Sequence, residues 1–297
     1  MLMRARVMPP WRGWLPLLVL PGSVLLLRPP AWPPWALMWC LAAALFFGCK
    51  WLTWRRGPSN ESAWSRQAGY LVAWPGLDAN AFLESRSVST VAPRRTLEWL
   101  LAVSRLVGGA ALFWFIHLLV SDQQPILLGW AGMVGIVLML HFGLFHLLSC
   151  VWRTVGVDAR PIMNRPLAST SVSAFWGRRW NAGFHDFAYP FVYQPLKRRM
   201  GPRAAIIAGF LFSGLVHEIV ISVPAGAGYG LPTLFFGIQA SALLFERSKC
   251  GKALGLGTGW RGWLFTMTVL ALPAYGLFHP PFVRTVVVPF MRAFRAA

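Results

Sequence analysis

QQPILLGWAGMVGIVLMLHFGLFHLLSCVW, residues 123–152, is a run of 30 residues without a single charged side chain. A helix needs about 20 mostly apolar residues to cross the hydrocarbon core of a bilayer. The run therefore predicts one long, tilted membrane-spanning helix, and the same reasoning extends to the rest of the chain.

The overall composition agrees with this interpretation. Of the 297 residues, 56% are hydrophobic and only 12% are charged, whereas soluble domains carry about 25% charged residues. This much apolar surface exceeds what one water-soluble core can bury, and it also excludes disorder and collagen-like repeats. The chain is predicted to be an integral membrane protein.

Six further apolar ranges are candidate spans, although the first of them is short. They are 13–27, 29–49, 98–121, 204–223, 231–245 and 262–283. We therefore expect an all-α, polytopic transmembrane protein with about seven spans (six to nine), forming one integral-membrane domain over residues 1–297. The first range could be a signal peptide, but no small-residue cleavage site follows it, so a retained helix kinked at Pro16 and Pro21 is favoured.

The net charge of +19 has a topological explanation. With a cytoplasmic N-terminus, 23 of the 28 Lys and Arg residues fall in predicted cytoplasmic segments, four fall on the other side, and Arg105 lies inside a span. This asymmetry follows the positive-inside rule, and no nucleic-acid-binding motif is present. We expect a multi-pass protein of the inner or plasma membrane in a bacterium, or of the endoplasmic reticulum in a eukaryote, with membrane lipid rather than nucleic acid as its surroundings.

His217 lies deep inside the range 204–223, where an ionisable group marks a functional site by default. The alternative is a histidine that only packs against a neighbouring helix. Ser213, one helical turn earlier, could orient the imidazole, and Gly209 with Ser213 could admit a close helix neighbour. Glu218 points about 100° away from His217 on a helix; pairing with a cation such as Arg105 is the plainer interpretation of it.

The second candidate region is FWGRRWN, Phe175–Asn181, in the largest predicted cytoplasmic segment. If it is helical, Trp176 and Trp180 share a face and Arg178 and Arg179 lie off it. One interpretation is an interfacial helix with Trp at headgroup depth. The other is a site for a cytosolic anion held by the arginines, with Asn181 as an uncharged donor.

Other residues give weaker signals. The four cysteines form no CxxC pair and are interpreted as small apolar residues. His141 and His146 are five residues apart, a spacing that does not favour a metal site, and we expect no metal and no tightly bound cofactor. Motifs for a nucleophilic serine, a P-loop or a dinucleotide site are absent from the sequence.

Phe175–Asn181, preceded by Pro161-Ile162-Met163, closely resembles the signature of the wax synthase branch of the membrane-bound O-acyltransferases. About 30 residues later, Phe212–Glu218 is similar to the SGL-x-HE helix of that family. The resemblance covers residues 146–246, which would form the wax synthase-like acyltransferase core. The sequence departs from the pattern at Gly237 and Gln239, where plant members tend to have His-Gly, and in being short for the superfamily.

The resemblance implies transfer of a fatty acyl group from acyl-CoA, as co-substrate, to the hydroxyl of a lipophilic alcohol. It implies that His217 and Asn181 are catalytic. Trp176, Arg178, Arg179 and Trp180 would then bind acyl-CoA, with Ser213 and Glu218 in support.

The residues themselves fit this chemistry, since a neutral His217 can act as a general base and Asn181 can donate to an oxyanion. Acylation of another hydroxyl acceptor (a sterol, glycerolipid or saccharide) stays open. So does a non-enzymatic transporter that uses His217, Glu218 and Arg105 as a proton relay, or an inert lipid-binding protein.

Overall fold

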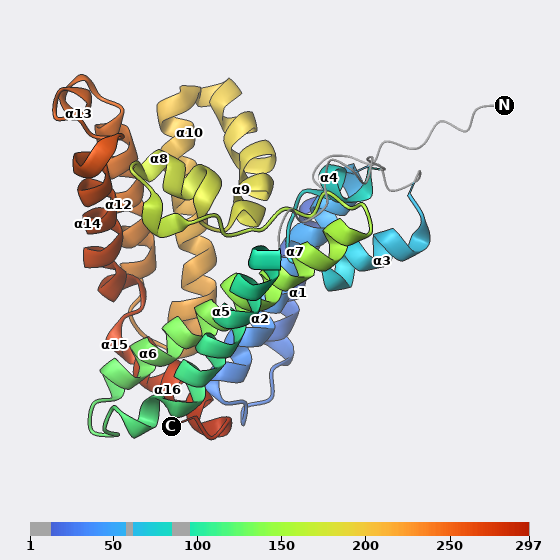
Figure 1. Cartoon of the computed structure of the whole chain (residues 1–297), viewed down its shortest axis with the longest axis vertical. Coiled ribbons are helices and arrows are strands. Elements are labelled where there is room, and N and C mark those ends of the chain that lie inside the picture. The colour runs from blue at the N-terminus through green and yellow to red at the C-terminus, as the bar shows by residue number, and fades with distance from the viewer. Residues whose placement is uncertain (1–12, 58–61, 85–95, 297) are drawn as a thin grey trace.

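The structure is a computed structural model, and it describes residues 13–57, 62–84 and 96–296. Most of these residues are helical, and no strand occurs among them. This confirms the predicted all-α class. Two groups of helices make up the fold: an inclined group from the N-terminal half and an upright group from the C-terminal half (Figure 1).

The N-terminal half supplies the inclined group. Its helices are α1 (Leu15–Leu27), α2 (Pro34–Arg56), α3 (Trp64–Ala73), α4 (Ala79–Leu83), α5 (Thr96–Phe115), α6 (Pro125–Val137) and α7 (Phe145–Thr154). Helix α1 packs along α2, and α5 packs along α6 and the π-helical turns of residues 138–144 that join α6 to α7. Most of the uncharged run 123–152 thus lies in one continuous helix, Pro125–Thr154, whose central turns are π-helical.

The C-terminal half supplies the upright group. Its main helices are α9 (Ala182–Ala188), α10 (Gln194–His217), α12 (Leu231–Glu246), α13 (Lys249–Ala253) and α14 (Gly259–Leu277), with short elements α8 (Val172–Ala174), α11 (Val223–Ala225) and α15 (Pro280–Phe282). The last helix, α16 (Val288–Ala293), lies at the lower end of the molecule (Figure 1), where it packs against α6 of the inclined group. Helix α12 packs between α10 and α14, and these three stand side by side in Figure 1.

Among the described residues, four helices are long and apolar enough to cross a membrane, by length and composition. They are Pro34–Arg56, Thr96–Leu118, Pro125–Thr154 and Ala182–Ala225. Two shorter apolar helices, Leu15–Leu27 and Leu231–Glu246, match two more of the predicted spans. The predicted seventh span, 262–283, is interrupted, because α14 ends at Leu277 and His279 caps a new helix. The structure therefore supports an integral membrane protein but does not confirm the count of seven.

The helix that carries His217 has a sharp internal break. Gly201 adopts φ 81°, ψ 170°, a conformation that side-chain-bearing residues rarely adopt, and Pro202 starts the next segment. Lys197, Arg198 and Arg199 therefore lie on a separate segment before the break. The apolar part that follows is the predicted span.

The close helix neighbour predicted at Gly209 and Ser213 occurs one residue further along. A Cβ on Gly209 would meet no atom within 4 Å, whereas a Cβ on Gly214 would lie 2.9 Å from the Cα of Thr233. The prediction that Gly209 and Ser213 form the close contact was therefore wrong, because Gly209 lies on a different face of α10 from Gly214. Gly214 is the residue that lets α10 and α12 approach.

Candidate active site

The FWGRRWN segment forms a short wide turn followed by a new helix. Phe175–Arg179 is π-helical, and Trp180 is already extended at φ −107°, ψ 121°. Asn181 takes the left-handed conformation, φ 45°, which Asn tolerates better than most residues. Its side-chain Oδ1 accepts a hydrogen bond from the Phe184 amide at 3.2 Å and so caps α9.

The two tryptophans of the segment do not share a face, contrary to the prediction. The Trp176 ring packs at 5.5 Å from the Phe236 ring, whereas Trp180 stacks on Phe175 at 5.6 Å and 11°. The helix ends at Arg179, so the four-residue spacing no longer places Trp176 and Trp180 together. Both rings are half-buried against protein, which argues against a simple interfacial helix.

The two arginines of the segment have different surroundings. Arg178 is exposed and lines a cavity of 880 Å³. Arg179 instead donates from Nη1 to the backbone carbonyl of Arg165 at 3.0 Å, and its own carbonyl accepts from the Asn164 amide. Arg178 is thus free to meet a ligand, and Arg179 holds the preceding loop.

His217 has one defined hydrogen-bond partner. Its Nδ1 lies 2.7 Å from the backbone carbonyl of Ser213. Because a carbonyl only accepts, Nδ1 carries the proton, and in the neutral imidazole Nε2 then has the free lone pair. Ser213 thus contacts the imidazole as expected, but through its carbonyl, since its hydroxyl donates to Gly209.

Glu218 does not pair with Arg105, so that expectation was wrong. Its Oε1 accepts from the Gly230 amide, the Thr233 amide and the Thr233 hydroxyl at 3.0, 3.1 and 2.8 Å. These donors lie at the start of α12, where unpaired amides favour a carboxylate. The Arg105 guanidinium lies on another element, 5.8 Å from the ring centroid of Phe142.

The two motifs meet through one aromatic ring. Phe236 of α12 contacts the His217 imidazole at 4.5 Å and the Trp176 ring at 5.5 Å between centroids. Among the described residues no hydrogen bond or ring contact joins Asn181 directly to His217. The structure therefore brings Trp176 and His217 around Phe236, and leaves Asn181 at the start of the neighbouring helix α9.

Gln239 is a polar contact of the tryptophan motif that the sequence marked only as a departure. It is fully buried, accepts from Trp176 Nε1 at 3.3 Å and donates to the Val269 carbonyl at 2.7 Å. Gln239 thus fixes the indole of Trp176 and links α12 to α14. A glutamine within an otherwise apolar helix is the sequence feature that could have indicated a specific hydrogen-bond partner for Gln239.

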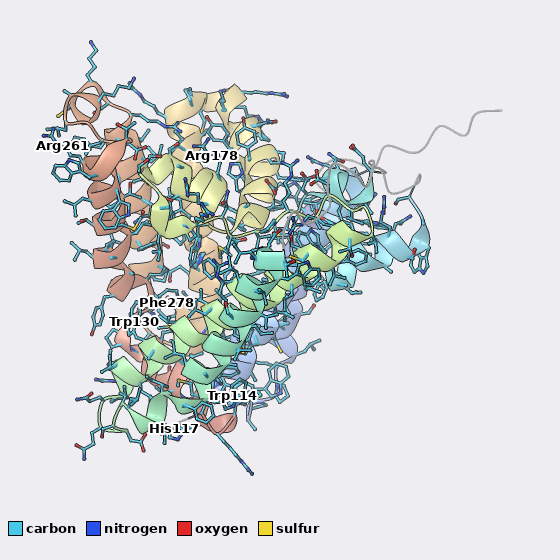
Figure 2. All side chains as sticks on the ribbon, in the orientation of Figure 1. Trp114, His117, Trp130, Arg178, Arg261 and Phe278 are labelled. Atoms are coloured by element: carbon cyan, nitrogen blue, oxygen red, sulfur yellow. The ribbon has the colours of Figure 1, made fainter. Side chains whose placement is uncertain are left out.

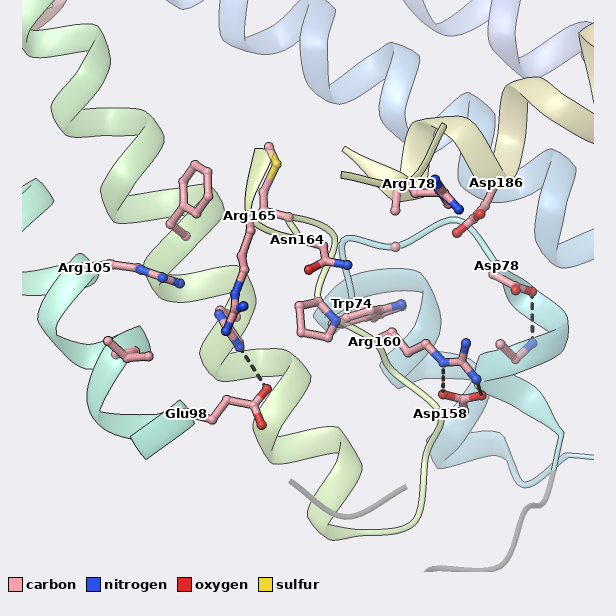
Figure 3. A pocket seen from close by; sticks show the side chains of 18 of the residues that line it. Trp74, Asp78, Glu98, Arg105, Asp158, Arg160, Asn164, Arg165, Arg178 and Asp186 are labelled. Atoms are coloured by element: carbon pink, nitrogen blue, oxygen red, sulfur yellow. Dashed lines mark hydrogen bonds and ion pairs between the residues drawn. The ribbon is translucent and has the colours of Figure 1, made fainter. Parts of the chain in front are cut away.

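A charged group in the cavity was also missed from the sequence. Glu98 lies 3.0 Å from His146 Nε2 and 2.5 Å from Arg153 Nη2, and Glu98 and His146 line the cavity (Figure 3). Glu98, His146 and Cys150 are close enough to resemble a metal-ligand set. The Arg153 guanidinium, however, already binds Glu98 and lies 3.4 Å from Cys150 Sγ, so these groups do not fit a cation.

The basic segments lie toward one end of the molecule. Arg178 and Arg261, which the charge count assigns to the same side, are both at the upper end in Figure 2. Trp114 and His117 lie at the opposite end. The arrangement agrees with the predicted sidedness.

Part of the chain that carries these features matches a known protein family. Residues 159–238 match the sequence model of the membrane bound O-acyl transferase family. That range includes the FWGRRWN segment and His217 and ends one residue before Gln239, and it confirms the predicted family resemblance.

The most informative relatives are plant proteins. The chain is 32% identical to the probable long-chain-alcohol O-fatty-acyltransferase 6 of Arabidopsis thaliana, over 41% of this chain and 37% of that protein. It is 38% identical to the long-chain-alcohol O-fatty-acyltransferase of Simmondsia chinensis, over 22% and 21%. The matches thus span well under half the length of these relatives.

Proposed function

We propose that the chain is a multi-pass membrane O-acyltransferase that moves a fatty acyl group from acyl-CoA to the hydroxyl of a lipophilic alcohol. The observation that carries the proposal is the hydrogen bond from His217 Nδ1 to the Ser213 carbonyl. It leaves Nε2 as a base in an apolar, helical setting, within a segment that matches an acyltransferase family.

In this mechanism His217 Nε2 removes the proton from the alcohol hydroxyl. The alcohol oxygen attacks the thioester carbonyl carbon, the C–S bond breaks, and the proton passes from His217 to the departing thiolate. Asn181 would stabilise the oxyanion through its Nδ2, because its Oδ1 is already occupied by the Phe184 amide. Acyl-CoA enters as a co-substrate, and no cofactor or metal takes part.

The segment around Trp176 would hold the acyl donor near His217. Phe236 joins the rings of Trp176 and His217, so a thioester lying along Trp176 reaches the imidazole. Trp180 supports the turn by stacking on Phe175, and the exposed Arg178 can meet phosphate oxygens of the donor. Ser213 orients the base and Glu218 anchors α12 beside it.

The acceptor is the less constrained part of this proposal. Gln239 occupies a helix that contributes to the site and differs from the pattern of plant members, so a sterol, glycerolipid or saccharide hydroxyl is an alternative acceptor. A proton-relay transporter is less well supported, because Glu218 caps α12 instead of meeting Arg105. The host membrane is the inner or plasma membrane in a bacterium, or the endoplasmic reticulum in a eukaryote.

The test is a product assay on membranes that contain the full chain. Labelled acyl-CoA is supplied with a panel of long-chain alcohols, a sterol, a diacylglycerol and a saccharide, and the lipid products are separated. We expect an alkyl ester that needs both donor and long-chain alcohol. An ester of another acceptor would revise the substrate, and the absence of any acyl transfer would refute the enzyme proposal.

A further inference from the structure

The 880 Å³ cavity is a separate feature from the surroundings of His217. It lies between α5, the start of α7, the loop of residues 158–165 and the start of α9, and His217 is not among its lining residues. Figure 3 shows charged side chains entering it from several of these elements. Four of them, Asp78, Glu98, Arg105 and Asp158, come from outside the family-matched range 159–238.

Two of the carboxylates in the cavity wall already have cationic partners. Glu98 binds both His146 and Arg153, at 3.0 and 2.5 Å. Asp158 binds Arg160 at 3.0 Å. The other two carboxylates that line the cavity are Asp78, which accepts from the Ala81 amide, and Asp186, which lies beside Arg178 in Figure 3.

Four arginines line the cavity: Arg160 pairs with Asp158, Arg178 lies beside Asp186 in Figure 3, and Arg105 and Arg165 are the other two. Within residues 13–57, 62–84 and 96–296, neither side chain forms an ion pair. Arg105 lies against the face of Phe142. Arg165 is placed by a left-handed backbone, φ 45°, and its carbonyl is held by Arg179. In Figure 3 the two side chains extend from different walls into the same part of the cavity.

Two guanidinium groups that share a partly enclosed space repel each other unless an anion lies between them. Their forked N–H donors match the oxygens of a phosphoryl group better than those of a smaller anion. Arg178 stands across the cavity beside Asp186, so it is not needed for this arrangement (Figure 3). We propose that the cavity binds a phosphoryl group between Arg105 and Arg165.

Two kinds of molecule could supply that phosphoryl group. One is a nucleotide phosphate, such as the one that an acyl-CoA carries. The other is a phospholipid headgroup, since the lining residues Leu97 and Leu101 are exposed on the outer surface of α5 and would meet lipid chains. The inference concerns binding alone and does not depend on acyl transfer.

The test measures binding of two phosphoryl probes to the purified full chain in neutral detergent. Adenosine 3′,5′-bisphosphate is titrated by calorimetry, and phosphatidylglycerol is followed by native mass spectrometry, with diacylglycerol as the matched lipid without phosphate. Wild type is compared with Arg105→Gln, Arg105→Lys and Arg165→Gln. The control is Arg203→Gln, which removes an exposed arginine outside the cavity.

We expect at least one phosphoryl probe to bind, and Arg105→Gln and Arg165→Gln each to weaken it about tenfold. Arg105→Lys should weaken it less, and Arg203→Gln should match wild type. Binding of the nucleotide alone or of the lipid alone identifies the source. The proposal is overturned if neither probe binds, or if Arg165→Gln, an exposed loop variant that should fold normally, binds both as wild type does.

Discussion

The hydrogen bond between His217 Nδ1 and the Ser213 carbonyl determines which imidazole nitrogen can act as a base. It joins two residues of the same helical turn and uses a backbone acceptor, so it survives any change of the Ser213 side chain that keeps the helix. A Ser213→Ala variant would therefore keep the tautomer of His217. The carbonyl, and not the hydroxyl, is the orienting group.

The two arginines of the FWGRRWN segment should behave differently when changed. Arg178→Gln removes an exposed cation and should raise the KM for acyl-CoA severalfold with little change in thermal stability. Arg179→Gln removes the donor to the Arg165 carbonyl and should lower stability by about 1 kcal/mol. Kinetics and thermal unfolding of both purified variants separate the roles. Equal KM values for Arg178→Gln and wild type would exclude Arg178 from donor binding.

Sequence alone predicts the residues of the two motifs but not their partners. Asn181 and His217 are identified by motif and by depth in a span. Glu98, however, contacts residues 48 and 55 positions away, and only packing of α5 against α7 brings them together. The predicted pairing of Glu218 with Arg105 was wrong because donors at the start of α12 bind the Oε1 atom of Glu218 instead.

At the level of helices, the turn after His217 is wider than an α-helical one. Residues Glu218–Ser222 are π-helical, and such turns are frequent at functional sites. The carboxylate of Glu218 then reaches the first turn of α12, so the helix that carries His217 is tied to the helix that carries Phe236. Apolar patterning predicts these helices well, but it does not reveal π turns or the break at Gly201.

The contact between α10 and α12 depends on the lack of a side chain at Gly214. Gly214→Ala places a Cβ 2.9 Å from the Thr233 backbone and should cost about 1–3 kcal/mol as the helices are forced apart. The matched control Gly209→Ala meets open space and should be neutral or stabilising by up to about 1 kcal/mol. Thermal unfolding in detergent compares the two. Equal stability of both variants would mean that the close approach does not support the fold.

At the scale of the whole molecule, the basic segments gather toward one end. The uneven distribution of Lys and Arg between the predicted cytoplasmic segments and the opposite side predicts this sidedness from the sequence. The cavity between the two helix groups could not be predicted, because it is formed by segments far apart in the chain. The sidedness is what would place Arg178 and the acyl donor in the same compartment.

The native cysteines offer a direct test of this orientation. Cys250 is exposed at the basic end, whereas Cys49 and Cys150 are buried and Cys40 is half-buried. A membrane-impermeant maleimide should label Cys250 in inside-out vesicles and not in right-side-out vesicles, because α13 is predicted to be cytoplasmic. A Cys250→Ser variant is the control for the labelled site. Labelling from the outside alone would reverse the proposed topology.

The most direct test of the central claim is the rate of ester formation by His217→Ala. In membranes with equal amounts of folded protein, given labelled acyl-CoA and a long-chain alcohol, loss of the general base should slow the reaction by about 10²–10⁴-fold. His117→Ala, an exposed histidine at the opposite end of the molecule, should react at the wild-type rate. Ester formation by His217→Ala at the wild-type rate would contradict the account.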